Sequence, residues 1–459
     1  MMLPAMSAQA QDLKSAFYTE EYLYRHTMNP AYGNEQNYIT IPALGNLNVR
    51  TQGNFGYDAI VQRNPLAGRP GQKDMTTFMN PLISTDDALS GFHSGRNRIM
   101  VNAGLTLLSA GFKSFGGYST IELNSKTSAG ASVPYELFEF AKNTGNRSYD
   151  IGDVRASAMS YVELAFGHSR QIGSKLKVGA KVKVLFGAAR ADLLMENVRA
   201  DLSGTDKWLI QGNALADVSM KGFSYKEEYK EYKQDPRGTY RRVNDVDVSG
   251  AGIGGMGVAF DIGGEYTISQ DWKVNLALLD LGFIRWNNDV QAQNINGNVV
   301  FDGFHDASVT SDRPGTHGTI KEQGQSYGDQ FADFANLQSL GNQGGRTTGI
   351  GATINVGAEY NLPVYRPITF GLLSSTRING SYTWTDLRLS ANWKPLKWLD
   401  GGIALARSSF ATSFGWVVNL HPRGFNFFLG MDHLLGKMSA EGIPLSSNAS
   451  VTLGMNVTW

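Results

Sequence analysis

Apolar and polar residues alternate strictly over the last nine residues of the chain. Val451, Leu453, Met455, Val457 and Trp459 are apolar, and each residue between them is small or polar. This period of two is expected of a β-strand with one apolar face and one polar face. A membrane barrel must pair its last strand with its first, because an unpaired edge is not tolerated in lipid. The pattern therefore predicts an outer-membrane β-barrel, with Val457 and Trp459 as the membrane-assembly signal on its terminal strand.

The clearest internal hairpin turns at Gly173-Ser174 and continues into a strand in which aliphatic residues alternate with lysines. In a soluble β-sandwich these lysines would face water. In a membrane barrel they must face the lumen, because a lysine on the lipid face at the bilayer midplane costs about 2–4 kcal/mol. The same alternation puts acidic residues of other strands on the polar face. The candidate lumen-facing residues are Lys175, Lys177, Lys181, Lys183, Glu163, Asp261 and Glu265.

Similar alternation recurs along the rest of the chain, and the expected strands number about 14, an even number as bacterial barrels require. We therefore expect an all-β fold, a single antiparallel transmembrane β-barrel over residues 46–459. Long polar loops around residues 223–249 and 287–347 are expected outside the cell, because such barrels keep their short turns in the periplasm.

Three local features are expected between the strands. One hairpin is expected to turn at residues 109–111, where Ser-Ala-Gly interrupts the aliphatic pattern. Short helices are expected at residues 133–143 and 327–340.

Two segments precede the expected barrel. Residues 1–10 are expected to be the remnant of a signal peptide, because Ala8 and Ala10 fit an A-x-A cleavage site. Residues 11–45 are rich in aromatic side chains and contain Pro30, which favours extended or turn geometry in the residue before it. We expect this segment to lie in the periplasmic mouth of the barrel as a plug.

Composition excludes several classes of protein. No run approaches the roughly 18 consecutive apolar residues of a membrane helix. A mean hydropathy of -0.25 is still compatible with a membrane barrel, because polar residues alternate with the apolar ones in its strands. The 41 basic and 41 acidic residues cancel, so we expect no nucleic-acid partner. The chain has no cysteine, which excludes disulfides, thiolate catalysis and a lipid-modified cysteine.

No catalytic, cofactor or metal site is expected from the motifs. The seven histidines are scattered, and none forms the i, i+4 pair suited to a metal. His93-Ser94 and His168-Ser169 are adjacent pairs, but neighbouring residues of a strand point to opposite faces. The glycine-rich run at residues 250–255 opens a strand, whereas a phosphate cradle needs the start of a helix. We therefore expect that the protein is not an enzyme.

Five segments carry a resemblance to known barrels: MNPAY (28–32), YVELAFG (161–167), KLKVGAKVKVLFG (175–187), FDIG (260–263) and LGFIRW (281–286). Through them the chain resembles a family of Bacteroidota outer-membrane β-barrels, distantly similar to PorP/SprF-type and FadL-type (OmpP1/FadL/TodX) barrels. The resemblance spans nearly the whole mature chain and implies the fold and the cell outer membrane of a Gram-negative bacterium. It implies no substrate and no catalytic residue.

The sequence is compatible with two functions. The first is a FadL-like passage for a small hydrophobic or amphipathic molecule. Lysines that face the lumen would favour anionic molecules, unless these lysines pair with Glu163, Asp261 or Glu265. The second is a non-transporting subunit of a larger outer-membrane complex for protein secretion or outer-membrane protein assembly, because long loops can dock partners. The expected partners are outer-membrane lipid and lipopolysaccharide, the barrel-assembly machinery, and surface lipoproteins or other outer-membrane subunits.

Overall fold

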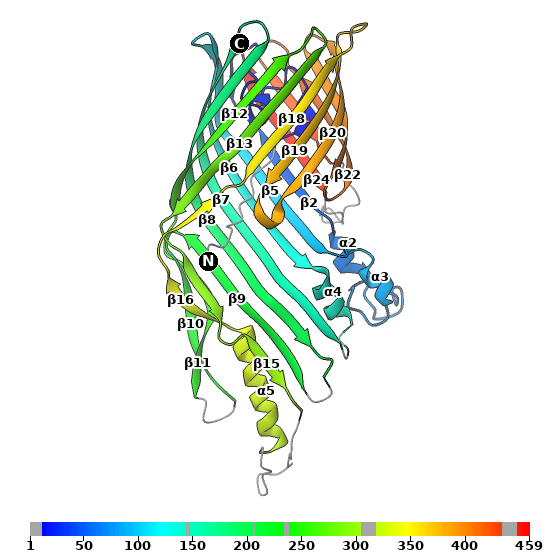
Figure 1. The fold of residues 1–459 in the computed structure, drawn as a ribbon, viewed down its shortest axis with the longest axis vertical. Coiled ribbons are helices and arrows are strands. Elements are labelled where there is room, and N and C mark those ends of the chain that lie inside the picture. Colours follow the sequence, from blue (N-terminus) through cyan, green and yellow to red (C-terminus); the bar gives the residue numbers. More distant parts are fainter. Residues whose placement is uncertain are drawn as a thin grey trace.

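The chain forms a closed antiparallel β-barrel of fourteen strands within the residues that the structure, a computed structural model, describes (Figure 1). These residues are 12–143, 145, 147–204, 207–233, 238–303, 318–433 and 448–459. The predicted signal-peptide remnant at residues 1–10 lies outside them. Two positions of the barrel wall are each filled by two consecutive short strands: β1 (Tyr38–Thr40) with β2 (Leu47–Gly53), and β17 (Arg346–Gly349) with β18 (Ala352–Asn361). The other twelve strands are β5 (Arg96–Ser114), β6 (Gly117–Pro134), β7 (Ser148–Ile172), β8 (Leu176–Asp201), β12 (Gly255–Thr267), β13 (Trp272–Trp286), β19 (Ile368–Ile378), β20 (Trp384–Leu396), β21 (Leu399–Ser408), β22 (Thr412–Leu420), β23 (Asn426–Met431) and β24 (Ala449–Thr458).

The terminal strand closes the barrel against the first strand. β24 pairs with β1 and β2, with Asn456 opposite Thr40 and Val451 opposite Val49. The backbone groups of Trp459 also exchange hydrogen bonds with those of Asn37. The predicted all-β barrel of about 14 strands is therefore confirmed.

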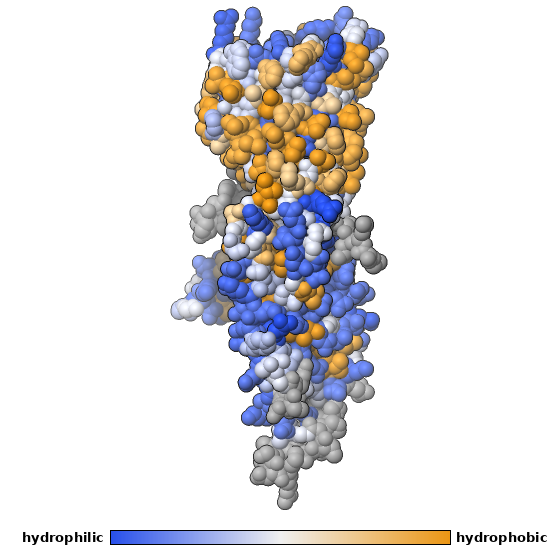
Figure 2. All heavy atoms as spheres, turned by 90° about the vertical axis from the view of Figure 1, so that its left-hand side faces the viewer, coloured by the Kyte–Doolittle hydropathy of each residue, from blue (hydrophilic) through white to orange (hydrophobic). Residues whose placement is uncertain are grey.

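The two faces of each strand differ as the alternation predicts. On β8, Val182 is exposed on the outer face, while Lys181 and Lys183 are buried inside the barrel. Apolar side chains gather on the outer surface of the upper part of the molecule, and hydrophilic ones dominate its lower part (Figure 2). The upper part therefore presents the apolar belt that a membrane barrel needs. No helix among the described residues is both long enough and apolar enough to cross a membrane.

Short connections gather at one end of the barrel, at the top of Figure 1. They include the turn at residues 173–175 between β7 and β8 and the turn at residues 268–271 between β12 and β13. The opposite end carries the long connections, including those at residues 54–95 and 287–345. Because barrels place long loops outside the cell, the end with short turns is the periplasmic end.

The barrel wall continues well beyond the apolar belt on one side. β8 pairs with β12 as far as Gly187, and from Ala189 onward it pairs with β9 instead (Figure 1). We call the resulting structure the outer extension. Its elements after β8 are β9 (Trp208–Met220), the hairpin of β10 (Phe223–Glu231) and β11 (Thr239–Val248), β14 (Val290–Asn294), β15 (Asn298–Phe301), α5 (Ile320–Ala335) and β16 (Leu337–Asn342).

A small aromatic cluster covers another part of the outer end. It joins the connection between β2 and β5 to the helix between β6 and β7, and it contains Phe55, Phe78, Phe92 and Phe138. The expected helix at residues 133–143 is present as part of this cluster. The elements involved are α2 (Tyr57–Ile60), β3 (Val61–Arg63), β4 (Met75–Thr77), α3 (Thr85–Leu89) and α4 (Tyr135–Lys142).

Two local predictions differ from the structure. The turn expected at residues 109–111 lies inside β5, and the chain reverses at Phe115-Gly116. Gly111 is required there for space, because a Cβ would lie 2.3 Å from Tyr38 Cε1. The helix expected at residues 327–340 begins earlier, at Ile320, where Thr319 and Glu322 form a capping box, and it ends at Ala335 before β16.

Candidate functional site in the barrel lumen

The residues before β1, 12–37, lie inside the barrel, and we call them the N-terminal segment (Figure 1, dark blue). They contain only the short helices η1 (Lys14–Ala16) and α1 (Arg25–Met28), joined by turns. The largest cluster of buried apolar residues forms around this segment. Aromatic rings of the segment pack against the wall in it, as Tyr22 does against Phe428 with ring centroids 4.9 Å apart.

One carboxylate of the wall anchors the start of the segment. Asp432 follows β23 and accepts hydrogen bonds from the backbone nitrogens of Lys14 (3.0 Å) and Ser15 (2.7 Å) and from the Ser15 hydroxyl (2.7 Å). Arg50 of β2 forms an ion pair with the same carboxylate, and Arg388 of β20 lies 3.3 Å from it. Both guanidinium groups and the carboxylate are buried. The start of the segment therefore depends on a charged cluster that spans three strands.

Further along, the segment meets the wall through backbone carbonyls and tyrosines. The Asn355 amide of β18 donates to the Met28 carbonyl at 2.9 Å, and the Tyr18 hydroxyl donates to the Leu372 carbonyl at 2.8 Å. Tyr24 donates to Asn456 of the terminal strand at 2.9 Å. These contacts distribute the segment around much of the barrel circumference.

Glycines of the wall make room for the segment. A Cβ on Gly179 would lie 1.9 Å from the Pro30 carbonyl oxygen, and a Cβ on Gly357 would lie 2.1 Å from the Tyr18 hydroxyl. A Cβ on Gly263 would lie 2.1 Å from the Asn29 side-chain oxygen. Glycines on the polar face of the predicted strands were therefore the sequence signal for a segment packed against the inner wall. The sequence does not reveal that residues 12–37 are that segment.

The residues predicted to face the lumen lie on the inner wall of the barrel, except for Lys175. Lys183 lies 2.7 Å from Asp261, and Lys177 lies 3.5 Å from Glu265 near the periplasmic mouth. Glu163 is buried and forms an ion pair with Lys126 at 2.9 Å. Lys175, in contrast, lies in the exposed turn between β7 and β8.

Among the charged residues of the inner wall that sequence reasoning missed, three lie beside the predicted lysines and carboxylates. Glu122 of β6 lies 2.6 Å from Lys181, and Lys126 of the same strand pairs with Glu163 as described above. Asp280 of β13 lies 2.5 Å from Lys183. It occupies a bulge opposite Asp261, with φ 59°, and its backbone nitrogen donates to the Asp261 carboxylate at 2.7 Å. A bulge shifts the alternation by one residue, so no period-two reading could place Asp280 inside.

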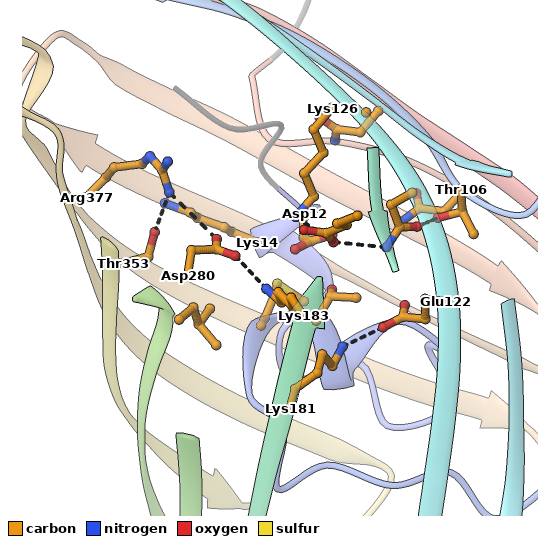
Figure 3. Close-up of a pocket in the computed structure, with 18 of the residues that line it drawn as sticks. Asp12, Lys14, Thr106, Glu122, Lys126, Lys181, Lys183, Asp280, Thr353 and Arg377 are labelled. Atoms are coloured by element: carbon orange, nitrogen blue, oxygen red, sulfur yellow. Dashed lines mark hydrogen bonds and ion pairs between the residues drawn. The ribbon is translucent and has the colours of Figure 1, made fainter. Parts of the chain in front are cut away.

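A central cavity and a mouth cavity border the N-terminal segment inside the barrel. The central cavity has a volume of about 70 Å³ and lies among Asp12, Lys14, Lys126, Lys183 and Arg377, whose side chains converge in Figure 3. The mouth cavity, at the periplasmic end, has a volume of about 300 Å³ and is lined by residues of the segment and by charged residues of the wall. Most residues of both linings are charged or polar, so both cavities offer hydrogen-bonding groups to an occupant.

The described residues contain no group of three or more histidine, cysteine or carboxylate side chains that could hold a metal ion. The adjacent pairs His93-Ser94 and His168-Ser169 do not act together in the structure. His168 instead lies 2.9 Å from the Ser119 hydroxyl, and His93 accepts from the backbone of Gly95.

The model of one protein family, described as a family of unknown function (DUF5723), matches residues 30–432 of the chain. The chain belongs to the DUF5723 family. The match begins inside the N-terminal segment of this DUF5723 protein and ends at Asp432, so it includes the anchoring carboxylate and nearly all of the barrel. No curated protein sequence matches the chain.

Solved structures similar to the DUF5723 chain are outer-membrane barrels at low sequence identity. A deltaS2S3 mutant of the monoaromatic hydrocarbon channel TodX is 10% identical, with a TM-score of 0.41, and the match covers 99% of this chain and 97% of that one. A FadL homologue from Pseudomonas aeruginosa is 9% identical, with a TM-score of 0.40 and coverage of 100% and 99%. The toluene transporter TodX from Pseudomonas putida is 9% identical, with a TM-score of 0.38 and coverage of 99% and 95%.

The closed barrel, its apolar belt and its polar lumen make this DUF5723 protein an integral protein of the Gram-negative outer membrane.

Proposed function

We propose that the protein is a FadL-like passage for a small amphipathic molecule, gated by its N-terminal segment. The observation that carries this proposal is the pair of cavities inside the barrel, each bordered by the segment. Met28 lines the central cavity and Arg25 lines the mouth cavity, so the same short helix α1 touches both. Displacement of this one segment would join the two spaces.

The lining favours an amphipathic molecule over a hydrocarbon. Buried polar groups must find hydrogen-bond partners, and a purely apolar molecule would leave those of the lumen bare. The lysines expected to attract anions mostly pair with acidic residues, as Lys181 does with Glu122. Their charge is therefore largely neutralised, and the proposal does not require an anionic molecule.

The test is uptake into proteoliposomes of hexyl glucoside, a neutral amphipath, and hexanesulfonate, an anionic one. We expect uptake above that of protein-free liposomes, and faster uptake for Asp432→Asn, which loosens the segment. Asp400→Asn, a neutralised lumen carboxylate with a single backbone contact to the segment (Glu21, 3.1 Å), is the matched control. Background uptake of both molecules by all three proteins would refute the passage.

A second function is favoured by the outer extension. Its hairpin of β10 and β11 pairs with no other strand by backbone hydrogen bonds within the described residues, and it stands clear of the apolar belt. Such a projection suits a non-transporting subunit that docks surface lipoproteins or other outer-membrane subunits. Gentle detergent extraction followed by native mass spectrometry tests this: a stoichiometric partner lost on deletion of residues 223–248 would favour the subunit, and a lone monomer would contradict it.

A further inference from the structure

The central cavity contains buried polar atoms that the ion pairs of the lumen do not use. Lys126, Lys181 and Lys183 each have a carboxylate within 3 Å, so their charges are accounted for. Other atoms of residues that line the cavity have no hydrogen-bond partner within the described part of the chain. They include Lys14 Nζ, Ser375 Oγ, Asn46 Oδ1, Asn355 Oδ1, Glu122 Oε1 and Glu163 Oε2.

Acceptor oxygens outnumber donors among these atoms. The Asn355 oxygen is fixed as an acceptor, because the amide nitrogen of the same side chain donates to the Met28 carbonyl. The free oxygens of Glu122 and Glu163 only accept, since their other oxygens lie within 3 Å of lysines. Lys14 Nζ only donates, and it lies 3.9 Å from the centre of the Trp384 ring. All these side chains are more than nine-tenths buried.

This balance selects among ligands. A small anion would satisfy Lys14 but would face the unpartnered oxygens of Glu122 and Glu163. A hydrocarbon would satisfy neither donors nor acceptors. A hydroxyl group both donates and accepts, so a molecule with several hydroxyls can donate to the carboxylates and to Asn355 while it accepts from Lys14.

We infer that the central cavity is a binding station for a small hydroxyl-rich group, either a free polyol or the polyol head of an amphipathic molecule. This inference rests on the proposed passage and names the chemistry that the passage recognises. The volume of about 70 Å³ holds about five waters, so it accommodates a group of about six non-hydrogen atoms, which is the size of glycerol.

The test is saturation-transfer-difference NMR on the full chain in detergent, with glycerol as the probe and acetate and 1-propanol as probes of similar size. We expect transfer to glycerol that neither of the other two displaces. Ser375→Val removes one hydroxyl from the cavity and should weaken glycerol binding about fivefold, the equivalent of one hydrogen bond. Ser374→Val, on the outward face of the same strand, is the matched control and should leave binding unchanged.

Other results would overturn the station. Displacement of glycerol by acetate would make the cavity an anion site, and the absence of transfer to any probe would make it a hydrated cavity only. Competition by glycerol monobutyrate distinguishes a free polyol from the polyol head of an amphipathic molecule. If glycerol monobutyrate displaces bound glycerol at a lower concentration than unlabelled glycerol does, the ligand is the head of an amphipathic molecule. If it needs a higher concentration, the ligand is the free polyol. Glycerol binding without any proteoliposome uptake would refute the passage and keep the station, whereas uptake without glycerol binding would do the reverse.

Discussion

Asp432 should control how often the N-terminal segment leaves the wall. Its carboxylate accepts three hydrogen bonds from Lys14 and Ser15, and asparagine at this position keeps one oxygen and no charge. A hydrogen bond to a charged group contributes about 1.5–3 kcal/mol, so the change should cost the anchored state roughly 3 kcal/mol. At 1.4 kcal/mol for each tenfold change, the open fraction of the segment should rise about 100-fold.

The chain has no cysteine, so a single introduced thiol reports this opening cleanly. Ala16 is fully buried in the anchored segment, and Ala16→Cys labelled with a maleimide in intact outer membranes measures the rate at which the segment becomes accessible. We expect labelling about 100-fold faster when Asp432→Asn is added to Ala16→Cys.

The matched control for this measurement is Asp400→Asn, which removes one backbone hydrogen bond to Glu21 instead of three bonds at the anchor. It should accelerate labelling of Ala16→Cys by about tenfold, the equivalent of about 1.5 kcal/mol for one such bond. Equal labelling rates for Asp432→Asn and its parent would show that the segment is held elsewhere. Equal acceleration by both substitutions would show that lumen charge in general, and not this carboxylate, holds the segment. Because loss of Asp432 also leaves two buried arginines short of a partner, heat-modifiable migration on gels is needed to confirm that each variant folds.

Three further outcomes are expected. Gly357→Val should lower the yield of folded barrel on heat-modifiability gels, because its side chain would meet the Tyr18 hydroxyl, while Ala358→Val on the lipid face should not; equal yields would contradict the close packing. Val182→Lys places a charge on the lipid face at a cost of about 2–4 kcal/mol and should reduce the amount of inserted protein measured by outer-membrane fractionation, whereas Val182→Leu should insert normally; normal insertion of both would reverse our assignment of the faces. Deletion of Trp459 should lower surface levels measured by cell-surface labelling, Trp459→Phe should retain them, and normal levels after the deletion would refute the assembly signal.

The charged lumen also changes one expectation about Lys183. From the alternation alone, a lumen-facing lysine is expected to tolerate replacement by glutamine, because it faces away from lipid. The structure places Lys183 between Asp261 and Asp280, so its loss would leave buried Asp261 without its cation and Asp280 with only the Arg377 guanidinium at 3.8 Å. Such an uncompensated buried charge is strongly destabilising, and we expect Lys183→Gln to reduce folded yield where Lys177→Gln at the mouth does not.

The amino-acid sequence by itself determined the barrel. Period-two alternation is a local property, because successive side chains of a strand point to opposite faces whatever the strand pairs with. It was therefore enough to read Val182 and Lys183 as outer and inner residues, to count about 14 strands, and to expect closure at the terminal strand. The misplaced turn at residues 109–111 shows the limit of this reading: a glycine ends a strand in one context and makes space for a tyrosine in another.

Only the tertiary structure decided what the polar face does. Pairing of β8 with β12 and the shared barrel interior bring Glu122 of β6 to Lys181 and Asp280 of β13 to Lys183, from positions up to 97 residues away. The bulge at Asp280 depends on how β12 pairs with β13, and the packing of residues 12–37 depends on glycines of several strands that face one interior. Ion pairs and close backbone contacts depend on distances of a few ångströms in three dimensions, and a repeating one-dimensional pattern contains no such distances.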